Sequence, residues 1–174
     1  MESDRNRVQL LVILVIILVG LIYLYKSQEK VTPSYYSINI SETYPHDDQA
    51  FTQGLAIHDG YLYESTGLYG YSSLRKTELA TGVVSEHVDL SDIYFGEGMT
   101  IMDGRIYLLT WKENTCFVYS LDDLTTLQSF SYPGEGWGLT NDGDHLILSN
   151  GSSTLTFMNP ETFKVVKTIE LLAI

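Results

Sequence analysis

Short apolar runs recur along the chain from about residue 44 onward, separated by turns rich in glycine and aspartate. Many of these runs alternate apolar and polar positions, which is typical of β-strands with one buried face. Three Asp-Gly dipeptides, at Asp59, Asp103 and Asp142, each stand between two such runs. We expect a β-hairpin at each of them, because a type I′ turn needs residues that accept positive φ. The pattern therefore predicts an all-β domain.

The apolar runs belong to one repeat that occurs three times. Each copy opens with a glycine (Gly54, Gly98 or Gly138), passes through an apolar strand to its Asp-Gly turn, and continues into three further strands. The opening glycines are spaced by 44 and 40 residues. The expected second strands are 61–63, 106–109 and 146–148, the third strands 73–76, 116–119 and 154–157, and the fourth strands 83–88, 127–130 and 165–169.

Four short antiparallel strands per repeat of this length predict the blade of a β-propeller. A β-sandwich also has short strands at similar spacing, but it does not predict the same glycine and the same Asp-Gly at a fixed period. We therefore expect a partial β-propeller over residues 44–174, with blades at about 51–90, 95–132 and 135–171.

Three blades do not close a ring, since propellers typically have about 4–8 of them. An open arc would leave strand edges and apolar blade faces uncovered. The run 170–174 stops where a fourth blade would begin. We therefore expect either a chain shortened from a longer protein or an association that completes the ring.

The N-terminal region is a separate object. Residues 10–25 form an apolar run that is interrupted only by Gly20. With flanking residues included, a helix over 8–25 approaches the length that spans a bilayer. The run ends in large side chains and lacks the small residues of a cleavage site, so we favour an uncleaved transmembrane signal-anchor over a cleaved signal peptide. The expected organisation is a tail at 1–7, the signal-anchor at 8–25, a tether and leading strand at 26–43, and a propeller on the extracytoplasmic side, secreted if the segment is cleaved.

Composition narrows the range of functions. The chain carries a net charge of −12, which argues against nucleic acid as a partner because phosphate binding needs lysine and arginine gathered on one face. Its single cysteine, Cys116, allows no intrachain disulfide. Cys116 lies in an apolar alternating run, where we expect it to be a small core residue and not a nucleophile.

The residues that precede the repeated glycines form the main candidate site. The first strand of a propeller blade lines the central channel, so equivalent positions of the repeat converge at one mouth of it. These positions are Gln53, Glu97 and Trp137. Three further aromatic residues reach the same mouth by the same argument: Phe51, Phe95 and Trp111. A mostly apolar pocket with one carboxyl and one carboxamide has the form of a small-ligand site.

A carboxyl group among aromatic rings loses solvation, which raises its pKa. Glu97 would then exchange protons near neutral pH, as general acid–base catalysis requires. Two structural alternatives remain open. Glu97 can serve only to bond backbone amides around the channel, and Trp111 and Trp137 can serve only as core packing.

Other candidate chemistry is weaker. His46-Asp47-Asp48 contains metal-ligating side chains, but adjacent residues on a loop seldom supply a full ligand set. Residues 69–73 form a predicted loop that can rim the pocket. No Ser–His–Asp pattern and no phosphate-binding glycine loop is evident in the sequence. We expect neither a metal nor another cofactor.

Five blocks of the sequence, in order and in register, are together far more specific than any one of them. They lie at 44–55, 64–75, 95–100, 109–111 and 136–139. These blocks resemble the plant and bacterial type of glutaminyl cyclase, the glutaminyl-peptide cyclotransferase family. The resemblance covers about residues 44–169.

The resemblance implies a five-bladed propeller that converts the N-terminal glutamine of peptides or proteins to pyroglutamate and releases ammonia, without a metal. It implies that Glu97 is the catalytic glutamate. The pocket residues that it implies are Gln53, Phe51, Phe95, Trp111 and Trp137. The family's fourth and fifth blades carry further pocket residues, an asparagine, a tryptophan and a lysine, which correspond to no position up to Ile174. A non-catalytic propeller that binds without turnover, and a structural domain without a pocket, are the alternatives.

Overall fold

A computed structural model describes residues 5, 7, 12–21 and 34–172 of the chain. It divides into two compact units, Met1–Ser41 and Glu42–Ile174. In the first unit, residues 12–21 are helical with exposed side chains, and residues 34–41 have no regular secondary structure. Among the described residues, no helix combines the length and the apolar character that a membrane crossing needs. The predicted signal-anchor at 8–25 lies partly outside the described residues.

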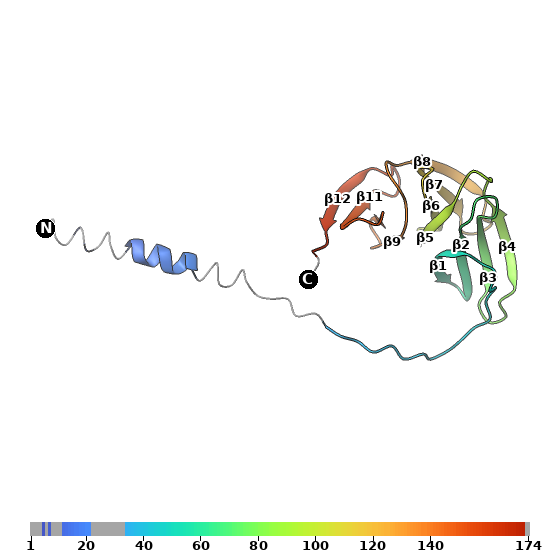
Figure 1. Cartoon of the computed structure of the whole chain (residues 1–174), viewed down its shortest axis with the longest axis horizontal. Coiled ribbons are helices and arrows are strands. Elements are labelled where there is room, and N and C mark those ends of the chain that lie inside the picture. Colours follow the sequence, from blue (N-terminus) through green and yellow to red (C-terminus); the bar gives the residue numbers. More distant parts are fainter. Residues whose placement is uncertain (1–4, 6, 8–11, 22–33, 173–174) are drawn as a thin grey trace. The chain divides into compact units, whose positions relative to one another are not determined.

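The second unit consists of three four-stranded antiparallel sheets, each built from strands that are consecutive in sequence. In Figure 1 the sheets stand one after another, with β1, β5 and β9 on the inner side and β4, β8 and β12 on the outer side. The prediction of an all-β domain with propeller-like, four-stranded sheets is confirmed.

The first sheet contains β1 (Thr52–His58), β2 (Tyr61–Thr66), β3 (Ser73–Glu78) and β4 (Val84–Asp89). The second contains β5 (Gly96–Met102), β6 (Arg105–Thr110), β7 (Thr115–Ser120) and β8 (Thr126–Ser131). The third contains β9 (Leu139–Asn141), β10 (Leu146–Leu148), β11 (Thr154–Met158) and β12 (Val165–Glu170).

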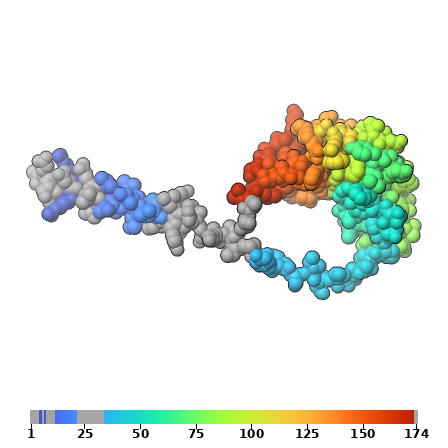
Figure 2. Space-filling view, viewed as in Figure 1, coloured from blue at the N-terminus to red at the C-terminus, as the bar shows by residue number. Residues whose placement is uncertain are grey.

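Neighbouring sheets pack face to face, and the space-filling view shows them in continuous contact from the first sheet to the third (Figure 2). In the middle sheet, strands β5, β6 and β7 contribute buried residues to the cores on both faces. In β6, Ile106 and Leu108 belong to the core shared with the first sheet, and Tyr107 and Leu109 belong to the core shared with the third. This explains why β6 is apolar at almost every position, since a strand covered on both sides loses the apolar–polar alternation.

Cys116 on β7 is fully buried in the core between the second and third sheets. Burial raises the pKa of its thiol far above the ordinary value. The thiol is therefore kept in its neutral form, which is not the nucleophilic one. The expectation of a small core residue is confirmed.

The first and third sheets each present one face that no other sheet covers in the described part of the chain. Leu55 and Ile57 on β1 are 56% and 65% exposed. On β12, Val165 and Ile169 are 57% and 44% exposed. All six residues of β12 are exposed, and the residues of β1 are partly buried or exposed.

The Asp-Gly hairpins follow the expectation at two of three places. Asp59 with Gly60, and Asp103 with Gly104, both adopt positive φ, as a type I′ turn requires. In the third, Gly143 has positive φ and Asp142 does not. Its Oδ1 instead accepts the backbone N–H groups of the two residues that follow Gly143, which closes a longer loop. The type I′ turn predicted at this dipeptide was wrong, although the hairpin between β9 and β10 forms.

Candidate active site

The three positions before the repeated glycines lie on neighbouring inner segments. The backbone N–H of Gly98 donates to the carbonyl oxygen of Trp137 over 2.7 Å. A Cβ on Gly98 would stand only 2.5 Å from that same oxygen. On the other side, a Cβ on Gly54 would stand 2.5 Å from the backbone nitrogen of Met99. At Gly54 and Gly98 the neighbouring inner segments approach so closely that a side chain has no space.

Irregular strand pairing marks two of the three positions. The register between β1 and β2 shifts between Thr52 and Gly54, so that Gln53 is an extra residue on β1. The register between β5 and β6 shifts between Gly96 and Met99, the stretch that contains Glu97. A β-bulge of this kind bends its strand and redirects a side chain, and bulges are common beside active sites. Here two of them act on the residues that carry the candidate chemistry.

Glu97 occupies a partly buried position on β5. The pKa of its carboxyl is raised from 4.5 to about 7, first by burial and then by the negative charges of Glu113 and Glu135. Its backbone carbonyl accepts a 2.5 Å hydrogen bond from the Ser65 hydroxyl of β2, which fixes this part of β5 against the first sheet. The side chain is thus a carboxyl that can hold or release a proton near neutral pH.

Aromatic rings form a continuous wall around Phe95, which lies two residues before Glu97. Phe51 meets Phe95 edge to face with 6.2 Å between ring centroids. Phe95 meets Trp111 at 5.6 Å and Tyr69 at 5.4 Å, again in edge-type contacts. The predicted rim loop therefore does reach the site through Tyr69. Edge-to-face pairs of this kind are favourable beyond the area that they bury.

Trp137 joins this wall through a carboxylate that sequence reasoning did not single out. Glu135 Oε2 accepts the indole N–H of Trp111 at 2.8 Å and that of Trp137 at 2.9 Å. Glu135 occupies the repeat position that holds Phe51 and Phe95 in the other two copies. A glutamate at an otherwise aromatic repeat position, two residues before a tryptophan, was the signal that could have identified it.

A second missed carboxylate is Glu113, in the loop after β6. Its Oε1 accepts the Tyr69 hydroxyl at 2.8 Å, and its Oε2 accepts the backbone N–H of Phe95 at 3.3 Å. Glu113 therefore connects the rim loop of the first sheet to the second sheet. Its charge also contributes to the raised pKa of Glu97.

The predicted site residues are not all joined by contacts. Phe51, Phe95 and Trp111 touch in sequence, and Trp137 reaches them through Glu135. Gln53 is partly buried on β1, and no hydrogen bond of its side chain to another described residue is found.

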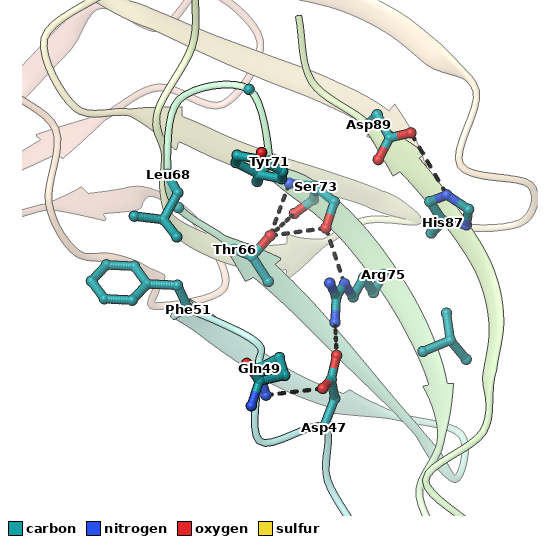
Figure 3. Close-up of a pocket in the computed structure, with 13 residues that line it drawn as sticks. Asp47, Gln49, Phe51, Thr66, Leu68, Tyr71, Ser73, Arg75, His87 and Asp89 are labelled. Carbon is teal, nitrogen blue, oxygen red and sulfur yellow. Dashed lines mark hydrogen bonds and ion pairs between the residues drawn. The ribbon is translucent and has the colours of Figure 1, made fainter. Parts of the chain in front are cut away.

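A separate hollow lies over the open face of the first sheet (Figure 3). It has a volume of about 820 Å³, and it shares Phe51 and part of the predicted rim loop 69–73 with the predicted site. Arg75 and Asp47, which form an ion pair of 2.7 Å, also line it. Glu97 does not line this hollow, so the hollow is not the candidate site predicted from the sequence. The lining side chains labelled in Figure 3 are Asp47, Gln49, Phe51, Thr66, Leu68, Tyr71, Ser73, Arg75, His87 and Asp89.

The side chains of His46 and Asp47 bind different partners. The His46 ring nitrogen Nε2 lies 3.1 Å from a carboxylate oxygen of the buried Glu64. Asp47 instead pairs with Arg75. Among the residues that the structure describes, no three His, Cys, Asp or Glu side chains are grouped as metal ligands. The two contacts fasten the segment before β1 to the first sheet.

Comparison with known proteins extends this picture. The sequence matches the family described as glutamine cyclotransferase over residues 12–173. It is 45% identical over 130 residues to the glutaminyl-peptide cyclotransferase of Arabidopsis thaliana, covering 74% of this chain and 41% of that protein. The crystal structure of Myxococcus xanthus glutaminyl cyclase superposes with a TM-score of 0.68 at 35% identity, covering 74% of this chain and 54% of that one.

A more distant likeness concerns the fold alone. The WD40 domain of Neurospora crassa Pan2 superposes with a TM-score of 0.58 at 12% identity, covering 68% of this chain and 36% of that one. The chain thus spans about half the length, or less, of the cyclase relatives that it matches. On the extent of the family match and the 45% identity, the chain belongs to the glutamine cyclotransferase family.

Proposed function

We propose that this chain carries the catalytic glutamate and one wall of a glutaminyl-peptide cyclotransferase pocket. The reaction converts an N-terminal glutamine of a peptide or protein to pyroglutamate and releases ammonia. Membership of the family supports the reaction class. The observation that carries the proposal is Glu97, a partly buried carboxyl with a pKa of about 7, two residues after Phe95 of the continuous aromatic wall.

In this reaction the α-amine nitrogen of the substrate attacks the side-chain carboxamide carbon of the same residue. A new C–N bond closes the five-membered ring, the bond to the amide nitrogen breaks, and one proton must move from the amine to the departing nitrogen. Ring closure within one residue depends mainly on holding the two ends together, and a fixed geometry is an efficient way to lower such a barrier.

Glu97 is the proposed carrier of that proton. As a carboxylate it accepts the proton from the attacking amine, and as a carboxylic acid it donates the proton to the leaving nitrogen. A group with a pKa of about 7 is present in both forms at neutral pH, so it can perform both steps. An ordinary exposed glutamate would hold almost no proton at that pH.

The remaining predicted residues position the substrate. Phe51, Phe95, Trp111 and Trp137 are proposed to enclose the flat carboxamide and to exclude water. Gln53 is proposed to hydrogen-bond the substrate through its own carboxamide. The three sheets are proposed to be blades of a five-bladed propeller, whose further blades would complete the pocket.

We also propose that residues 8–25 anchor the protein in a membrane, with the sheets on the extracytoplasmic side. The support is the apolar run of the sequence and the helical conformation of residues 12–21. Carbonate extraction of membranes tests the anchor, and protease accessibility of the sheets in sealed right-side-out vesicles tests the orientation. Release of the chain by carbonate would contradict the anchor. Protection of the sheets from protease added outside these vesicles would contradict the orientation.

The activity is tested with a peptide that begins with glutamine and with the same peptide carrying an acetylated α-amine. We expect the full chain to release ammonia and form pyroglutamate from the first peptide only, because a blocked amine cannot attack. Binding of the first peptide without ammonia release would favour the non-catalytic alternative. If the chain neither binds the first peptide nor releases ammonia from it, the proposal is overturned.

A further inference from the structure

Two indole groups from different sheets meet on one carboxylate oxygen. Trp111 directly follows β6 of the second sheet, and Trp137 lies shortly before β9 of the third. Glu135 lies in the connection between those sheets, and its Oε2 accepts both indole N–H groups, at 2.8 and 2.9 Å. A carboxylate oxygen has two lone-pair directions and can accept two such bonds. The indole groups of Trp111 and Trp137 are therefore connected through a single oxygen atom.

The backbone around Glu135 is fixed on both sides. The N–H of Gly136 donates to the carbonyl oxygen of Trp111 at 2.9 Å, and the N–H of Trp137 donates to that of Ser149 at 3.0 Å. A Cβ on Gly136 would stand 2.9 Å from the carbonyl oxygen of Thr110, so the chain passes very close to the end of β6 here. The carboxylate is thus presented to the indoles by a segment with little freedom.

The two indoles depend on this carboxylate to different degrees. Trp111 is also held by the ammonium group of Lys112, 3.8 Å from its ring centroid, and by the edge contact with Phe95. Trp137 is 48% exposed and rests its six-membered ring against Gly151, where a Cβ would stand 2.8 Å from the ring. The bond to Glu135 is therefore the contact that sets the ring of Trp137 relative to Trp111.

We propose that Glu135 is a positioning residue that holds Trp111 and Trp137 at a fixed relative orientation and places a permanent negative charge beside Glu97. The tie between the indoles stands on the geometry alone. Its consequence for catalysis rests on the proposed function, since an aligned pair of rings and a nearby charge matter only if the pocket holds a substrate.

The charge and the hydrogen bonds of Glu135 can be separated by two variants. Glu135→Gln keeps an acceptor oxygen and removes the charge, whereas Glu135→Ala removes both. The indole bonds lower the pKa of Glu135, the one from Trp137 most and the one from Trp111 next. Glu135 therefore stays ionised at neutral pH, and its charge helps to keep Glu97 protonated there.

The tie is tested on the full chain by NMR of the indole N–H groups. The chain has only two tryptophans, so it gives two indole signals, and Trp111→Phe assigns them. In the unaltered chain we expect both signals to shift together as the pH falls, with one common midpoint below the ordinary glutamate value. Two different midpoints, or no shift of either signal, would overturn the shared-carboxylate tie without requiring any variant to fold.

The variants extend the test. Glu135→Ala should move both signals to the positions of free indoles, and Glu135→Gln should leave both close to their hydrogen-bonded positions. Glu113→Ala is the matched control, because that carboxylate binds Tyr69 and the Phe95 backbone and neither indole. The proposal is overturned if the indole signals do not move in Glu135→Ala, or if they move equally in Glu113→Ala.

Turnover of a glutamine-initiated peptide then separates this inference from the proposed function. If Glu135 positions the rings, Glu135→Ala should raise the KM at least about tenfold, whereas the KM of Glu135→Gln should stay close to that of the unaltered chain. Equal KM values for both variants and the unaltered chain would contradict the catalytic part. A chain whose two indole signals share one pH midpoint but which shows no turnover would contradict the proposed function and leave the shared-carboxylate tie intact.

Discussion

The backbone N–H of Gly98 donates to the carbonyl oxygen of Trp137 over 2.7 Å, which brings the catalytic candidate Glu97 next to the inner segment of the third sheet. The same approach leaves no space for a Cβ on Gly98, which would meet the oxygen of Trp137 at 2.5 Å and the nitrogen of Leu139 at 2.6 Å. Both of these are backbone atoms, which cannot rotate away. The site therefore depends on this glycine for its geometry.

Gly98→Ala should destabilise the chain by at least about 3 kcal/mol, because the second and third sheets must separate to admit the methyl group. Gly104→Ala, in the turn that follows β5, is the matched control, since a Cβ there meets nothing within 4 Å and only the positive φ of +69° is unfavourable. The control should cost about 1–2 kcal/mol. Urea unfolding measures both, and equal losses for the two variants would contradict the close approach.

Gly151→Ala should displace the ring of Trp137, because a Cβ at residue 151 would stand 2.8 Å from that ring. Gly143→Ala is the control, since Gly143 also has positive φ, at +92°, and open space around it. Both variants should lose about 1–2 kcal/mol of stability from the backbone conformation. Only Gly151→Ala should change the tryptophan emission spectrum, and a matching change in Gly143→Ala would show that the spectrum reports backbone strain and not the ring contact.

Stability should fall with rising pH because of Glu97. Its pKa is raised from 4.5 to about 7 by burial and by the charges of Glu113 and Glu135. Between these two values the folded chain holds a proton that the unfolded chain has lost, so the free energy of unfolding decreases as the pH rises through the window and levels off above it. Glu97→Gln has no charge to bury and should lack this decrease.

Denaturant unfolding at several pH values measures the effect. We expect Glu97→Gln and the unaltered chain to differ little at about pH 4, and the variant to be more stable by roughly 1–2 kcal/mol at about pH 8, a range reduced for solvent screening. Glu113→Gln should narrow the pH range over which the stability falls, because it removes one of the charges that raise the pKa of Glu97. Stability curves that stay parallel at all pH values would contradict a raised pKa.

The fold could be predicted from sequence because its signals are local and repeated. Glycine and Asp-Gly at a fixed period predicted the four-stranded sheets, and the apolar run at 106–109 predicted the second strand of the middle sheet. The turn at Asp142 could not be predicted from its dipeptide, because Asp144 and His145 lengthen the loop and give the Asp142 side chain two backbone N–H groups to bind.

The site could be predicted only in part. Symmetry of the repeat brought Glu97 and Trp137 to adjacent inner segments. The repeat did not predict the register shifts at Gln53 and Glu97, which depend on pairing with β2 and β6. Nor did it predict the roles of Glu113 and Glu135, because a hydrogen bond between sheets depends on the final packing and has no signature in the spacing of residues.

Glu97 is proposed to carry the proton in the cyclisation of N-terminal glutamine. The most direct measurement is the rate of pyroglutamate formation by the full chain and by Glu97→Gln, followed through ammonia release between about pH 5 and pH 9. We predict turnover by the unaltered chain whose pH dependence changes near 7, and a loss of at least about 10²-fold in Glu97→Gln. A rate in Glu97→Gln equal to that of the unaltered chain would contradict the account.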